Sequence, residues 1–131
     1  MLKIPSLLPE QLEDLICRTI GCGIAVHRAL GPGLLENIYS RAICLELQEA
    51  NIPFETEKPI PVWYRGQLLC HQRLDLIVAG QIVIEIKAVD RFNPVHHAQL
   101  LSYLRVSNLR VGLLMNFNAA ILQDGLKRIV L

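Results

Sequence analysis

Two charged motifs interrupt the most apolar part of the chain and restrict how it can fold. Asp75 lies within RLDLIV, residues 73–78, and Glu85 and Lys87 lie within IEIK, residues 84–87. Burying ionised groups among Leu, Ile and Val costs several kcal/mol unless a partner compensates for it. An Asp, a Glu and a Lys brought together are able to hold a divalent metal beside a nucleophilic water, so we expect these charges to meet.

Length and composition indicate one folded domain over residues 1–131. A chain of this length builds a single core, and a hydrophobic content of 52% argues against disorder. The net charge of +1 gives no broad attraction to nucleic acid, so any such contact needs a local basic patch. No apolar run is long enough to span a membrane, because Glu85 and Lys87 interrupt the longest one.

The cysteines and histidines favour a reduced, cytoplasmic protein. The four cysteines form no CxxC pair, and no secretory leader precedes them. The spacing of the Cys and His residues matches no structural zinc pattern.

Hydrophobic spacing predicts a mixed sheet flanked by helices, an α/β fold. The expected elements, in order, are a helix over 10–30, a helix over 35–50, three strands within 59–89, a helix over 94–106, a strand over 111–117 and a last hairpin at Asp124-Gly125. Turns are expected at Arg65-Gly66 and at residues 79–81. Gly21 and Gly23 would allow close packing of the first helix.

The turn at residues 79–81 decides whether the two acidic strand positions coincide. A three-residue loop pairs Val78 with Ile82 and puts Asp75 opposite Glu85, whereas a two-residue loop separates them. Gly80 suits the three-residue loop. That register also places six branched aliphatic residues on one face, namely Leu74, Leu76, Val78, Ile82, Ile84 and Ile86.

The residue types then suggest metal chemistry. Two carboxylates supply hard oxygen ligands for Mg²⁺ or Mn²⁺, and the ion acidifies a bound water. Lys87 would orient that water or stabilise developing negative charge. The alternative is a solvated sheet face with an ordinary ion-pair ladder, and spacing alone leaves both interpretations open.

A glycine turn followed by Glu36 and Tyr39 opens the second helix. Gly33, Glu36 and Tyr39 are spaced at three, so Glu36 and Tyr39 share a helical face. Glu36 would add a carboxylate to the metal site. Alternatively, Glu36 complements the helix N-terminus and Tyr39 packs in the core.

The helix over 94–106 presents His96, Gln99 and Tyr103 on one face. We expect Gln99 near the site, with His96 the second candidate; the alternative places Tyr103 in the core and uses the polar pair for a helix-to-sheet hydrogen bond. His27 lies on an apolar stripe and is expected to be buried with a hydrogen-bond partner.

Trp63 and Tyr64, beside Arg65, form a candidate nucleic-acid contact at a hairpin tip. Such aromatic side chains stack on bases, although a hairpin tip of this kind also serves as a packing or partner surface.

Together these residues resemble the GxxExxY family, a branch of the PD-(D/E)XK nuclease superfamily. The resemblance covers nearly the whole chain. Besides Gly33, Glu36 and Tyr39 it includes VHR at 26–28, Arg73 and Asp75, EIK at 85–87, AQLLSYL at 98–104, GLLMNF at 112–117, and DG at 124–125 with KR at 127–128.

The resemblance implies a restriction-endonuclease-like αβββαβ core. Asp75 would be the metal-binding aspartate, Glu85 and Lys87 the (D/E)xK pair, Glu36 the acidic helix residue and Gln99 the polar residue of the following helix. Leu74 replaces the proline of the superfamily's name.

The expected function is therefore metal-dependent hydrolysis of phosphodiester bonds in nucleic acid, with Mg²⁺ or Mn²⁺ as cofactor. Asp75, Glu85 and Glu36 would hold the metal, Glu36 directly or through water. Lys87 would position the water and Gln99 would support it. Further residues expected near the site are Tyr39, His96, Tyr103 and Arg73.

Two alternatives stay open. The first is a non-catalytic nucleic-acid-binding or protein-interaction module that retains the fold. The second is a homo-oligomer or a subunit of a larger assembly.

Overall fold

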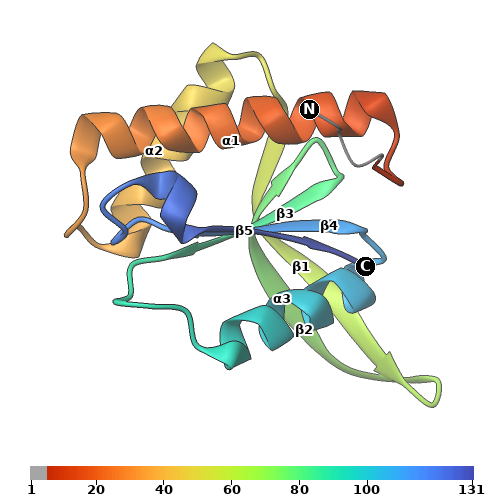
Figure 1. Ribbon diagram of the computed structural model, residues 1–131. Coiled ribbons are helices and arrows are strands. Elements are labelled where there is room, and N and C mark those ends of the chain that lie inside the picture. The colour runs from red at the N-terminus through yellow and green to blue at the C-terminus, as the bar shows by residue number, and fades with distance from the viewer. Residues whose placement is uncertain (1–5) are drawn as a thin grey trace.

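The computed structural model describes residues 6–131, in which three helices enclose a five-stranded sheet (Figure 1). In chain order the elements are α1 (Glu10–Leu30), α2 (Glu36–Glu49), β1 (Phe54–Tyr64), β2 (Gln67–Val78), β3 (Ile82–Lys87), α3 (Pro94–Ser107), β4 (Val111–Asn116), the short 3-10 helix η1 (Leu122–Gly125) and β5 (Leu126–Val130). The predicted α/β fold class is confirmed.

The sheet is mixed, with strand order β1-β2-β3-β4-β5. β3 and β4 are parallel and the other neighbours are antiparallel. Parallel neighbours need a long crossover connection, and α3 supplies it. Helices α1 and α2 lie on one face of the sheet and α3 on the other (Figure 1). The core is accordingly divided into two clusters, one on each face.

The helix α1 packs closely on the sheet at only one of its two inner glycines. A Cβ at Gly23 would lie 3.0 Å from the sulfur of Met115, whereas a Cβ at Gly21 would meet nothing within 4 Å. The predicted close packing therefore applies to Gly23. His27 is buried as expected, with its Nε2 2.8 Å from the carbonyl oxygen of Ala119.

The register between β2 and β3 is the one predicted from the three-residue loop. Val78 pairs with Ile82, and the pairing runs to Leu76 opposite Ile84. Gly80 has a φ of +64°, in the left-handed region.

The expected single aliphatic face is wrong at Leu74. Leu74 packs with the α3 cluster, whereas Leu76 packs with α1 and α2. The strict alternation of side chains therefore breaks at Asp75. On β1, Glu57 lies between the partners of Leu74 and Leu76 and has a φ of +52°, so the distortion involves both strands.

Two other element boundaries differ from expectation. β1 begins at Phe54 rather than within residues 59–89. Asp124 and Gly125 form the end of η1 instead of a tight hairpin turn, and β5 follows directly. The backbone of Gly125 approaches the carbonyl oxygen of Asn116 so closely that a Cβ has no room. The glycine therefore signals close packing rather than a turn.

Within residues 6–131, none of the helices combines the length and apolar character that crossing a membrane requires.

Candidate functional site

The candidate site lies where β2 and β3 stop pairing. The last pair is Leu76 with Ile84, and the next residues away from the loop are Asp75 on β2 and Glu85 on β3. β3 instead continues beside β4, with Glu85 opposite Leu114 and Lys87 opposite Asn116. The sequence thus places two acidic residues at a split in the sheet.

A cavity of about 480 Å³ opens beside this split, between α2 and the sheet. Asp75 and Ile86 line its floor, and α2 contributes Glu36. Its other lining residues are Asn37, Ser40, Arg41, Cys44, Thr56 and Glu57. The exposed carboxylates of Glu36 and Asp75 therefore face one space.

Glu85 is the buried member of the group, with only 6% of its surface exposed. Burial is the largest cause that raises the pKa of its carboxyl to about 7; the negative charges of Asp75 and Glu36 contribute to this rise, and Lys87 opposes it. Glu85, Asp75 and Glu36 are thus close enough to interact electrostatically. Two neighbouring carboxylates and a raised pKa are typical of functional sites.

The ion pair between Glu85 and Lys87 is loose. Lys87 Nζ lies 4.0 Å from Glu85 Oε2, which is too far for a hydrogen bond. Both side chains are largely shielded from solvent, at 19% and 8% exposure. The Lys87 ammonium consequently keeps its donors available for a water or a phosphate oxygen.

The carboxylates approach the split from opposite sides of β3. Ile86 lines the cavity, and side chains alternate along a strand, so Glu85 and Lys87 lie on the other face. Consistently, no three Asp, Glu, His or Cys side chains of residues 6–131 converge closely enough to hold a metal ion in this arrangement. The donor chemistry still suits Mg²⁺ or Mn²⁺, because all three candidate ligands are hard carboxylate oxygens.

Tyr103 on α3 faces the acidic residues from the side opposite the cavity. Burial raises the pKa of its phenol, and the charges of Glu85 and Asp75 raise it further. Arg73 also lies beside the site, where its Nη1 is 3.5 Å from an oxygen of the cavity residue Glu57.

Three other candidates lie elsewhere or have structural contacts. Tyr39 is fully buried, stacks on Phe117 at 4.4 Å, and donates a hydrogen bond to the carbonyl of Gly31. His96 accepts a hydrogen bond from the backbone of Asn93 and completes the N-terminal cap of α3. Gln99 is exposed on α3, and the hydrogen bonds of the described residues include none between it and the acidic group.

Sequence reasoning missed the polar lining that α2 adds around Glu36. Ser40 follows Glu36 by four residues, and Ser40 and Arg41 follow Asn37 by three and four, so helical periodicity would have identified this lining. Glu57 gives no such sign, because its place in the cavity depends on a left-handed backbone conformation.

Asn116 is a second omission, and it supports the chain that follows Lys87. Its side chain is buried and makes two hydrogen bonds with the backbone of Val89, accepting one at 3.0 Å and donating one at 2.7 Å. A polar residue ending an otherwise apolar strand is the sequence sign of this contact.

Comparison with known proteins agrees with this geometry. The family model of the PD-(D/E)XK nuclease superfamily matches residues 13–129. No curated protein and no solved structure gives a significant match. The match begins within α1 and ends within β5, and it includes all of the acidic residues at the split. The three helices and mixed sheet fit a restriction-endonuclease-like fold, and the chain belongs to the PD-(D/E)XK nuclease superfamily.

Proposed function

We propose that this protein hydrolyses phosphodiester bonds in nucleic acid with the help of Mg²⁺ or Mn²⁺. The observation that carries the proposal is the buried Glu85 carboxylate at the split between β2 and β3. It lies beside Lys87, and two further carboxylates, those of Asp75 and Glu36, raise its pKa. Superfamily membership supports a nuclease type of chemistry. The motif of Gly33, Glu36 and Tyr39 further suggests the GxxExxY branch.

Asp75 and Glu85 are the proposed metal ligands, and Glu36 binds directly or through water. The ion, when bound, supplies a Lewis acid that lowers the pKa of a coordinated water. The carboxylates do not converge in this arrangement, so binding of the ion requires the exposed side chains of Asp75 and Glu36 to turn toward Glu85.

A metal also resolves the electrostatic conflict among the carboxylates. Burial and repulsion from Asp75 and Glu36 raise the pKa of Glu85 to about 7, and a bound cation would replace that repulsion with attraction. The residues therefore favour a divalent ion most strongly when all three carboxyl groups are ionised.

Lys87 has the clearest role among the protein's own groups. Its ammonium is held near Glu85 without a hydrogen bond, so it is able to orient an attacking water or stabilise charge on the phosphate. Tyr103 lies near Glu85 and Asp75 on the α3 side, close enough for their charges to raise the pKa of its phenol. Gln99 is proposed only as a support for the water, from its place on α3.

The deciding experiment is cleavage of labelled duplex DNA, single-stranded DNA and RNA in Mg²⁺, Mn²⁺ or chelator. Wild type is compared with Asp75→Asn, Lys87→Ala and, for the supporting role, Gln99→Ala. We expect metal-dependent cleavage that Asp75→Asn and Lys87→Ala abolish. Cleavage that survives in both variants, or its absence with every substrate and folded protein, would contradict the proposal. The second outcome would favour a non-catalytic binding or assembly module.

A further inference from the structure

The β1–β2 hairpin extends beyond the rest of the sheet, past α3 (Figure 1). Its far end is unusually apolar for a free surface: Trp63 is 62% exposed, Tyr64 64% and Leu69 61%. Exposed apolar groups gathered at one place usually mark a contact surface. Residues 61–71, the outer half of the hairpin, belong to neither core cluster, so their apolar side chains require another explanation.

One face of the hairpin packs with the α3 cluster, and the other face continues toward the cavity beside α2. Directly paired residues share a face, and Lys58 pairs with Leu74, whose side chain packs with the α3 cluster. Ile60 packs with the same cluster. By alternation along β1, the other face carries Pro59, Pro61 and Trp63, and the prolines pair with Arg73 and His71. A register shift between Val62 and Trp63 adds one residue to β2, so Trp63 pairs with Leu68.

That second face continues from the candidate site. Asp75 lines the cavity beside α2, and Arg73 contacts the cavity residue Glu57. Leu68 lies seven positions before Asp75, which corresponds to about 23 Å along an extended strand. A track that carries Arg73, His71 and Trp63 therefore runs outward from the proposed centre.

The charged residues of the hairpin favour a negatively charged partner. Between Glu57 and Asp75 there is no acidic residue, and the basic residues available to this face are Arg73, which also contacts Glu57, and Arg65 at the turn. Lys58 lies on the α3 side and pairs with Glu55. A local positive region of this kind, in a chain of net charge +1, complements a polyanion.

The outer edge of β1 is poorly suited to strand addition. β1 is an edge strand of the sheet, and it contains Pro59 and Pro61, which pair with Arg73 and His71 of β2. Proline has no N–H group, so the outer edge of β1 lacks hydrogen-bond donors at these two positions. Prolines on an edge strand prevent another strand from pairing there. A partner must therefore contact the hairpin through side chains.

We propose that this face of the hairpin holds a single-stranded segment of the nucleic-acid substrate, with Trp63 stacking on a base. This inference rests on the proposed function and names its substrate class. Aromatic side chains stack on unpaired bases of any sequence, and nearby basic residues follow the phosphates. At 3.4 Å per stacked nucleotide the track spans about seven nucleotides.

Trp63 is the chain's single tryptophan, so intrinsic fluorescence reports on this position alone. A single-stranded 20-mer is titrated into the wild-type protein in chelator, where no cleavage takes place. We expect quenching of the emission by the single strand, weaker quenching by a blunt duplex of the same sequence, and none by inorganic phosphate. Equal quenching by duplex and single strand, or none by either, would overturn the inference.

Tyr64 provides a matched control, because it is adjacent, aromatic and equally exposed but points to the opposite face. Trp63→Ala should weaken binding of the single strand about 5- to 100-fold, and Tyr64→Ala should leave it nearly unchanged. Equal effects of the two substitutions, or none of Trp63→Ala, would contradict the proposed track.

The outcomes separate this inference from the proposed function. If Asp75→Asn abolishes cleavage while Trp63→Ala behaves as wild type, the nuclease proposal stands and the hairpin proposal fails. If single strands quench Trp63 but are never cleaved, the hairpin proposal stands and the nuclease proposal fails. If sedimentation shows a dimer that Trp63→Ala dissociates without nucleic acid, the hairpin is an interface between copies, and the proposal is wrong.

Discussion

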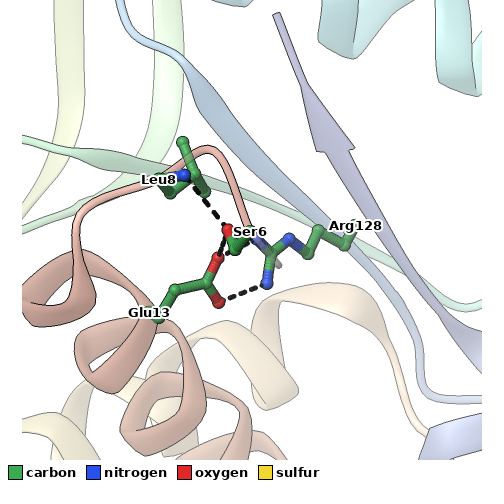
Figure 2. Close-up of polar contacts among 4 residues, drawn as sticks. All are labelled: Ser6, Leu8, Glu13 and Arg128. Atoms are coloured by element: carbon green, nitrogen blue, oxygen red, sulfur yellow. Dashed lines mark hydrogen bonds and ion pairs between the residues drawn. The ribbon is translucent and has the colours of Figure 1, made fainter. Parts of the chain in front are cut away.

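Glu13 and Glu85 are the same residue type in opposite situations. Arg128 donates to both carboxylate oxygens of Glu13, at 2.7 Å from its Nη1 to Oε2, and Ser6 donates a further hydrogen bond (Figure 2). These contacts lower the pKa of Glu13 to about 2. Glu85 accepts no hydrogen bond from any described side chain, its nearest cation is 4.0 Å away, and its pKa rises to about 7.

The comparison shows how the fold separates structure from chemistry. Glu13 joins α1 to β5, and its charge is fully matched by hydrogen bonds. Glu85 is held in place by the strand, and its carboxylate has no hydrogen-bond donor within the described residues. Binding of a cation would therefore stabilise the ionised form of Glu85. Stability and function therefore place conflicting demands on acidic residues, and this chain meets them at two different sites.

The largest expected effect comes from removing the cation of each pair. Lys87→Met should lower metal-dependent cleavage by at least about 100-fold, because charge stabilisation by a positioned group contributes on this scale. Arg128→Met should leave cleavage per folded molecule unchanged and lower only the melting temperature. Single-turnover rates on the same oligonucleotide measure both. A comparable loss of rate in folded Arg128→Met would remove the distinction between the two sites.

Neutralising Glu85 should stabilise the protein above neutral pH. A folded-state pKa of about 7, against 4.5 for the ordinary carboxyl, means that the folded state binds more protons between these values, so stability falls as pH rises through that window. Glu85→Gln removes this loss and should raise the free energy of unfolding at pH 8 by up to about 3 kcal/mol. Urea unfolding at pH 5 and pH 8 tests it, and Glu13→Gln, which should destabilise at pH 8, is the control.

Metal binding should be visible as a pH-dependent gain in stability. With free Mn²⁺ at 100 times its dissociation constant, binding to the folded state alone adds about 2.7 kcal/mol. We expect this gain at pH 8 and a smaller one at pH 5.5, where protons compete for Glu85. Melting curves of wild type, Glu85→Gln and Glu13→Gln, recorded with and without Mn²⁺ at both pH values, measure this gain in stability. An unchanged gain in Glu85→Gln would place the ion elsewhere.

The smallest effect concerns acid stability at the other glutamate. The pKa of Glu13 is depressed, so its stabilising contribution is present above about pH 4.5 and is lost as pH falls toward 2. Glu13→Gln should lower the melting temperature at pH 7 and flatten its fall over that acidic window. If the melting temperature of Glu13→Gln falls with pH as steeply as that of the wild type, other carboxylates control acid unfolding.

The fold was largely predictable because its information is local. Hydrophobic period and turn residues identified the three helices and the β2–β3 register, and the loop around Gly80 decided that register. Prediction failed where the local conformation depends on contacts with residues far away in the sequence. Gly125 is required by the backbone of Asn116, and Leu74 turns toward α3 because of a distortion centred on Glu57, which no local pattern reveals.

For the candidate site, spacing supplied the residues but not their directions. Asp75, Glu85 and Glu36 were selected as a group, and the structure brings their charges within mutual influence. Spacing could not show that Asp75 and Glu85 approach the split from opposite sides, since that depends on the broken alternation at Asp75. The cap contacts of His96 and the core packing of Tyr39 likewise depend on tertiary neighbours.

The contact between Glu13 and Arg128 also has a consequence for synthesis. The two residues are 115 positions apart, so the ribosome needs roughly 6 to 23 s between them at 5–20 residues per second. Throughout that interval α1 lacks the β5 residue that fixes its first turns and the β4 strand beneath Gly23. Helix α1 is therefore made before the other described elements but is among the last to be secured, and its apolar face must be shielded while the sheet is translated.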